Sequence, residues 1–155
     1  MNSPPLPRHQ ADALAVLQDL AAQRGWQGES LVVDGALVFQ APLPRDPDVS
    51  GAFFVVDAHE PNIRLYLTLP LKAPPAQIAA ASEYVIRCGY ARPFGALELD
   101  LDQGTLRVRM DVDAAGDALA PSVARLIDRA TALAREVSPG WRAVVREGVI
   151  LVSQG

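Results

Sequence analysis

Apolar and polar residues alternate strictly on both sides of a turn in the segment Phe94–Asp113. A period of two residues places successive side chains on opposite faces of a strand, so this segment predicts a β-hairpin. A two-residue loop at Gln103-Gly104 brings the apolar side chains onto one face, and a slip by one residue would separate them. The apolar residues of this face are Leu97, Leu99, Leu101, Leu106, Val108 and Met110. The charged residues set opposite each other are Asp100 with Arg107 and Glu98 with Arg109.

Three further segments have the composition of strands. The first is Ala36–Pro42, where the preceding Asp34-Gly35 permits either a tight hairpin or a turn into a strand; we favour one principal strand. The other two are about Gly51–Ala58 and Ile63–Leu69, and the latter alternates cleanly. Between the first and second lies Pro42–Ser50, which is too rich in proline for regular structure and predicts an exposed loop.

Apolar residues at intervals of three and four predict three helices, at about Arg8–Arg24, Pro74–Gly89 and Pro121–Val137. The residues of the second helix expected to face the core are Ile78, Ala81, Ser82, Val85 and Ile86. We expect Pro139-Gly140 to interrupt the third helix, because proline lacks a backbone N–H and clashes with the preceding turn. The apolar tail Val149–Val152 is expected to pair at a sheet edge.

The predicted order of elements is α-β-β-β-α-β-β-α. Most of the strands alternate instead of being uniformly apolar, which indicates an antiparallel sheet with one covered and one wet face. The fold class is therefore α+β, a two-layer domain with a five-stranded antiparallel sheet and helices packed on it. Residues 1–7, rich in proline, are expected to form a mobile tail, and residues 8–155 a single domain.

Composition narrows the class of protein. The chain has 155 residues, of which 50% are hydrophobic and 21% charged, as expected for one globular domain. A net charge of −4 and dispersed arginines disfavour nucleic acid or an anionic membrane as a partner. The N-terminal segment lacks the apolar core of a secretory signal, and no apolar run approaches the ~20 residues of a spanning helix. We therefore expect a cytoplasmic protein.

Few residues suggest chemistry. Asp57, His59 and Glu60 form the one cluster of acids with histidine, but a metal site would need further ligands, and a histidine beside a turn is usually solvated. The spacing Asp100-x-Asp102-x-Gly104 faintly resembles a calcium loop, yet β alternation continues to Asp111, where that loop requires glutamate. We therefore predict no catalytic, cofactor-binding or metal-binding residues.

Cys88 is the single cysteine, so the chain forms no intramolecular disulfide. It lies near Arg87 and Arg92, which favour the thiolate and so lower a thiol pKa. No partner histidine follows in a recognisable motif, so a buried or inert thiol is favoured over a nucleophile.

A candidate interaction surface begins at the consecutive apolar run 53–56. Both faces of this strand are apolar, so the outward pair must be covered either by the C-terminal tail or by a second protein. Tyr66 and Tyr84 are further candidates. The candidate partner or dimer surface is Phe53, Phe54, Val56, Tyr66 and Tyr84.

The segment Tyr90–Val112, followed by a helix with Leu126-Ile127 and by Pro139, resembles the C-terminal half of the YbjN family of bacterial sensory transduction regulators. In that family a Gly-x-Phe-x-Leu-Asp strand, an acidic-Gly turn and an Arg-containing strand precede a long last helix. The matching residues are Gly95, Leu99, Asp100, Gly104, Leu106 and Arg107, with Leu97 where the pattern has Phe. Ile86 and Gly89 stand where the family often has asparagines.

YbjN-like proteins are similar in fold to the dimeric chaperones of type III secretion. The resemblance implies a non-enzymatic homodimer that binds or stabilises a protein partner in a regulatory or chaperone-like role. A sheet edge that pairs with an extended segment, or an apolar groove, would supply the physical basis. The alternative is a small-molecule or lipid-binding domain with a cavity between the sheet and the helices.

Overall fold

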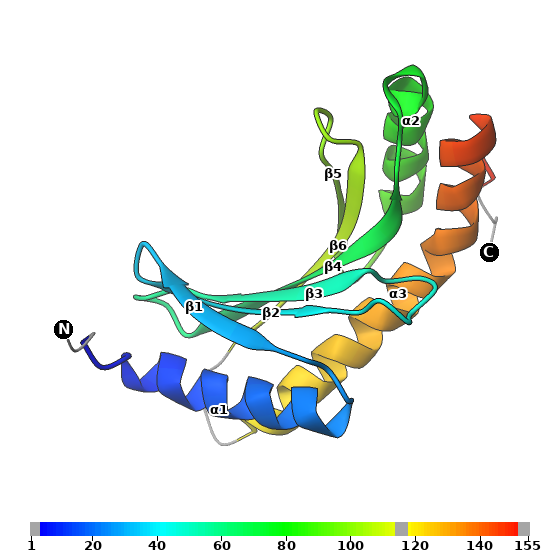
Figure 1. Ribbon diagram of the computed structural model, residues 1–155. Helices are drawn as coiled ribbons and strands as arrows, with labels where there is room; N and C mark the ends of the chain where they lie inside the picture. The colour runs from blue at the N-terminus through cyan, green and yellow to red at the C-terminus, as the bar shows by residue number, and fades with distance from the viewer. Residues whose placement is uncertain (1–3, 114–117, 152–155) are drawn as a thin grey trace.

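The computed structural model describes residues 4–113 and 118–151, which form one antiparallel sheet and three α-helices (Figure 1). The strands are β1 (Glu29–Val33), β2 (Ala36–Pro42), β3 (Gly51–Val56), β4 (Asn62–Lys72), β5 (Ala96–Leu99) and β6 (Thr105–Asp113). The helices are α1 (Arg8–Gln23), α2 (Ile78–Gly89), which follows the 3₁₀ turn η1 (Pro75–Gln77), and α3 (Leu119–Glu147). The predicted α+β class is confirmed.

The sheet has six strands in the order β1-β2-β3-β4-β6-β5, so the prediction of five was wrong. The additional strand is β1, which pairs with β2 through the turn Asp34-Gly35. Both turn residues have positive φ, at 49° and 82°, as the two-residue hairpin turn that matches strand twist requires. All five residues of β1 are exposed, so the strand lacks the alternation in burial that marks β3 and β6.

The hairpin of β5 and β6 forms, but its register differs from the prediction by two residues. Glu98 pairs with Arg107, and Asp100 lies in the turn instead of opposite an arginine. There its carboxylate accepts hydrogen bonds from the N–H groups of Asp102 and Gln103 at 2.9 and 3.0 Å. A turn in which an aspartate side chain binds the following backbone N–H groups is longer than the two-residue loop predicted from the alternation. A shift of two keeps the apolar face intact.

Helix α3 continues through Pro139 over 29 residues, contrary to the predicted interruption. Its last turns are held by Trp141, which is 1% exposed and donates a hydrogen bond from Nε1 to the carbonyl of Leu71 at 3.0 Å. Burial of this side chain offsets the roughly 3 kcal/mol that an internal proline costs. Helix α3 as a whole curves upward beside α2 (Figure 1), and a bend is what an internal proline produces in a long helix.

The chain after α3 does not pair at a sheet edge within residues 148–151, contrary to expectation; Val152 lies outside the described residues. Gly148 ends the helix with φ of +67°, and Ile150 packs against the core. At the other end of the chain, Leu6 of the predicted tail also packs against the core. The predicted loop before β3 is pinned by Val49, which is buried.

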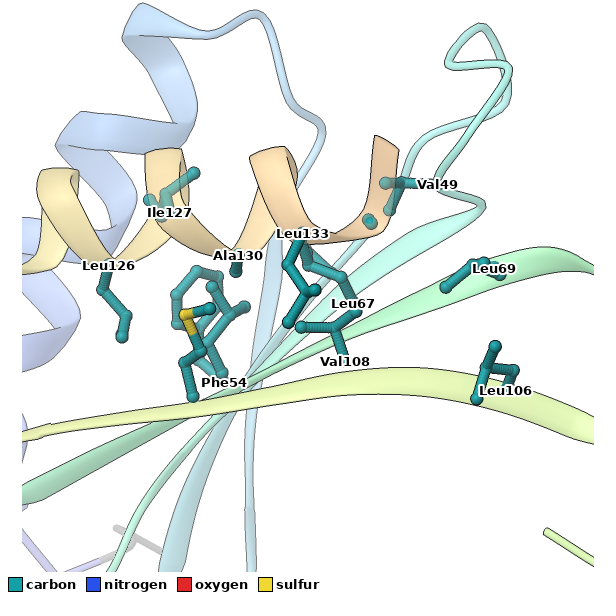
Figure 2. Close-up of a cluster of buried hydrophobic side chains, with 14 of the residues drawn as sticks. Val49, Phe54, Leu67, Leu69, Leu106, Val108, Leu126, Ile127, Ala130 and Leu133 are labelled. Atoms are coloured by element: carbon teal, nitrogen blue, oxygen red, sulfur yellow. The ribbon is translucent and has the colours of Figure 1, made fainter. Parts of the chain in front are cut away.

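Helices α1 and α3 cover one face of the sheet (Figure 1), and the core fills the space between them (Figure 2). Phe54, Leu67 and Val108 point from β3, β4 and β6 toward Ala130 and Leu133 of α3. Helix α2 stands beside the C-terminal half of α3 and also contacts β5. Its buried residues are Ala81 and Tyr84, whereas Ile86, expected in the core, is 72% exposed.

Candidate binding surface

The face of the sheet opposite α1 and α3 carries no helix in the described part of the chain (Figure 1). The sheet is bent, and this uncovered face lies on the inside of the bend. A register shift in β4 between Thr68 and Lys72 breaks the ladder with β6, as β-bulges that bend a strand do. The uncovered face is therefore a broad concave surface, and it is the candidate binding surface.

An apolar strip occupies the half of this surface made by β1, β2 and β3. Cross-strand pairing aligns Leu31 with Val38 and Val38 with Val55, and places Phe53 in the neighbouring row. Leu31 and Val33 are 41% and 47% exposed and Phe53 and Val55 are half-buried, while Val38 between them is only 6% exposed. The apolar strip, as the name is used below, consists of Leu31, Val33, Val38, Phe53 and Val55.

Tyr66 and the arginines Arg64, Arg107 and Arg109 occupy the other half, made by β4 and β6. The Arg107 guanidinium lies 4.0 Å from the centre of the Tyr66 ring, which contacts the Phe53 ring at a centroid distance of 6.0 Å. Glu98 pairs with both Arg107 and Arg109, at 2.7 and 3.3 Å. A cation over an aromatic face is an attractive arrangement that also orders both side chains. The surface thus passes from apolar to polar across a rigid aromatic centre.

The structure divides the predicted surface residues between the two faces. Phe53 and Tyr66 lie on the uncovered face, where Phe53 is half-buried and Tyr66 only 8% exposed. Phe54 and Val56 point into the core and are 1% and 0% exposed. Tyr84 is also buried, and its hydroxyl donates to the carbonyl of Val137 at 2.6 Å. Phe54, Val56 and Tyr84 are therefore core residues of the single chain, because strand alternation sends neighbouring residues to opposite faces.

Sequence reasoning missed the part of the surface that β1 contributes. Leu31 and Val33 come from a segment that was not assigned to a strand, although Asp34-Gly35 is a strong hairpin signal. The role of Arg107 beside Tyr66 was also missed, because these residues are far apart in sequence and meet through the pairing of β4 with β6.

The acidic and histidine residues considered for chemistry are engaged in structural contacts or exposed. Asp57 pairs with Arg64 at 2.9 Å, and His59 and Glu60 are exposed. Among the described residues, no group of three or more histidine, cysteine, aspartate or glutamate side chains is placed to hold a metal ion.

Cys88 lies in a hollow between α2 and α3 with Tyr84, Arg92 and Glu136. Burial raises the pKa of the Cys88 thiol above its ordinary value, and this outweighs the interaction with the Tyr84 hydroxyl and the charge of Arg92, which lower it. Arg87, expected to favour the thiolate, pairs with Glu83 instead, at 2.7 Å. The thiol is therefore protonated at neutral pH, which is the state of an unactivated cysteine.

No helix in residues 4–113 and 118–151 has both the length and the apolar character needed to cross a lipid bilayer. The sequence matches no protein-family model and no curated protein. The fold and the surface therefore define the class: a two-layer α+β domain in which the described residues place no helix over one face of the sheet.

Proposed function

We propose that this protein is a non-enzymatic protein-binding module that holds an extended segment of a partner protein on the uncovered sheet face. The observation that carries the proposal is the apolar strip on a concave face without a covering helix among the described residues. Apolar side chains gathered on an exposed surface mark a contact site, because leaving them in water is unfavourable. The proposal includes the YbjN-like resemblance, a regulatory or chaperone-like role and a cytoplasmic location.

An extended segment suits the shape and chemistry of this face. Its apolar side chains would lie on the strip around Phe53, and its polar groups would meet Arg107 and Arg109 at the other half, because Tyr66 is only 8% exposed beneath Arg107. Arginine is a residue type that supplies large contact areas and hydrogen bonds at interfaces. The alternative function needs room for a ligand between the sheet and the helices. Phe54, Leu67 and Leu133 fill that layer (Figure 2), so we do not favour it.

The test places a photo-crosslinking amino acid at Phe53 in the organism of origin, with the same group at Gln18 as the control. Gln18 is exposed on α1, on the side of the molecule opposite the open face. We expect Phe53 to capture one protein reproducibly, through one contiguous peptide, and Gln18 not to capture it. Equal capture from both positions, or capture from neither, contradicts the proposed surface.

We further propose that the protein is a homodimer joined through β1. The outer edge of this strand is unpaired in the sheet order, and all of its residues are exposed. The strand has no proline, lysine or bulge, the devices that protect sheet edges from association. Antiparallel self-pairing about Leu31 sets Glu29 opposite Val33 of the second copy, so the glutamates do not meet. The two apolar strips then become continuous.

Val32→Lys is expected to convert this dimer to a monomer, because it places a charge on the edge strand one residue from Leu31, the centre of the pairing. Light scattering measures the mass of the wild-type protein and of the variant. Leu101→Lys is the matched control, since Leu101 is exposed in the turn between β5 and β6, away from β1. A wild-type monomer at micromolar concentrations, or a Val32→Lys dimer, would overturn the proposed interface.

A further inference from the structure

A notch lies at the opposite edge of the sheet from β1, between β6 and the first half of α3. Strand β5 is short and pairs with β6 only as far as Arg109, whereas β6 continues to Asp113. The outer side of β6 is therefore not covered by β5 at residues 110–112. A cavity of about 370 Å³ occupies this place. The residues that form it and matter below are Phe94, Asp111, Ser122, Arg125 and Arg129.

The backbone of β6 offers hydrogen-bonding groups in this notch. The N–H of Asp100 donates to the carbonyl of Thr105 at 2.9 Å, which fixes the hydrogen-bonded positions of the β5–β6 ladder. Since these positions alternate along an antiparallel pair, the N–H and C=O of Arg107, Arg109 and Asp111 point toward the β5 side. Asp111 lies beyond the end of β5, so its backbone groups face the notch. They can pair with an added strand.

Two arginines flank this free edge. Arg125 and Arg129 are one turn apart on α3, and both are exposed. Among the described residues neither has a carboxylate partner, and Arg129 lies 4.7 Å from the centre of the Phe94 ring. Other arginines of the same helix are paired, Arg135 and Arg142 both with Asp48. Asp111 is the one carboxylate that lines the notch in the described part of the chain, so Arg125 and Arg129 leave it net basic in a chain with a net charge of −4.

We propose that the notch binds an extended acidic segment of the partner protein, which adds a strand to β6 at residues 110–112 and pairs its carboxylates with Arg125 and Arg129. This inference rests on the proposed function, and it adds that the bound segment of the partner is negatively charged. Charge complementarity selects the occupant, since a strand edge beside two guanidinium groups favours carboxylates. A second copy, docked through the same notch about a two-fold axis, would bring like charges together.

The probe is a fluorescein-labelled ten-residue peptide of alternating valine and glutamate, measured by fluorescence anisotropy against the purified protein. We expect saturable binding that weakens with added salt, and no binding of the valine–lysine peptide. Arg125→Glu/Arg129→Glu is expected to weaken binding of the acidic peptide roughly tenfold or more. Arg45→Glu/Arg146→Glu, an equal charge change at exposed arginines outside the notch, is the control and is expected to bind nearly as well.

Two further measurements separate strand addition from simple attraction of charge. The acidic peptide with alternate amides N-methylated loses its strand donors and is expected to bind far more weakly. Hydrogen exchange at the Asp111 amide is expected to slow when the unmodified peptide binds. Equal binding by the two double variants, or by the methylated peptide, overturns the proposal. Loss of peptide binding in Phe53→Glu, with full binding by Arg125→Glu/Arg129→Glu, would place the peptide on the uncovered face and overturn the notch, so failure at the notch is distinguishable from failure of the uncovered face.

Discussion

Gly104→Ala is expected to lower the free energy of unfolding by about 3 kcal/mol, the largest loss we expect from adding one methyl group. Gly104 has φ of +72°, which costs an L-residue about 1 kcal/mol. A Cβ at this position would lie 2.1 Å from the carbonyl oxygen of Ala73 and 2.9 Å from its nitrogen. These are backbone atoms held in place by the 2.8 Å hydrogen bond from Ala73 N–H to the Gly104 carbonyl. The added methyl group must therefore break the hydrogen bond between Ala73 and Gly104.

Gly25→Ala is the matched control for this loss. Gly25 has the same φ of +72°, but nothing lies within 4 Å of an added Cβ. Urea denaturation of the two variants thus separates backbone strain, common to both, from the clash with Ala73. We expect the control to lose about 1 kcal/mol. Equal losses from the two variants would show that the turn between β5 and β6 does not pack against the end of β4 as described.

Trp141→Ala is expected to cost about 4 kcal/mol of stability. The indole is 1% exposed, lies 6.5 Å from the Tyr84 ring between centroids, and donates to the carbonyl of Leu71. Its removal leaves a large void and an unpaired acceptor at the point where α2, α3 and β4 meet. Since this contact secures the helix after Pro139, the last turns of α3 are expected to unfold first.

Trp26→Ala is the control, because Trp26 is half-buried and follows α1. Its loss is expected to be about 1–2 kcal/mol. Thermal unfolding followed by circular dichroism compares the two variants and reports helix content. A Trp141→Ala variant that is no less stable than Trp26→Ala, with full helix content, would mean that α3 is not anchored by the indole.

Local periodicity predicted most of the elements, because an element buried on one face has apolar residues at regular intervals along the sequence. The alternation of β6 and the spacing of α1 are direct records of such burial. Strand β1 was not predicted because it is an edge strand exposed on both faces, so its apolar and polar residues do not alternate. The predicted interruption at Pro139 was wrong because the burial of Trp141 holds the helix together beyond the proline, and the sequence does not reveal that burial.

The sequence predicted the strand at the centre of the candidate surface but not which of its residues are on that surface. The apolar run 53–56 pointed correctly to a strand with two apolar faces, yet only the structure shows that Phe54 faces α3 and Phe53 faces the open side. The pairing of Arg107 with Tyr66 depends on the order β4-β6-β5, which local patterns do not define. Likewise, the notch beside Arg125 exists because β5 begins only at Ala96, opposite Arg109, while β6 continues to Asp113.

The most direct test of the uncovered face measures the affinity of the segment captured through Phe53 for three purified proteins: wild type, Phe53→Glu and Gln18→Glu. Circular dichroism first establishes that all three are folded. We predict that Phe53→Glu weakens binding by roughly tenfold or more, since a buried apolar contact is replaced by a charge, while Gln18→Glu binds as the wild type does. Equal affinity of all three proteins would contradict the claim that this face binds the partner.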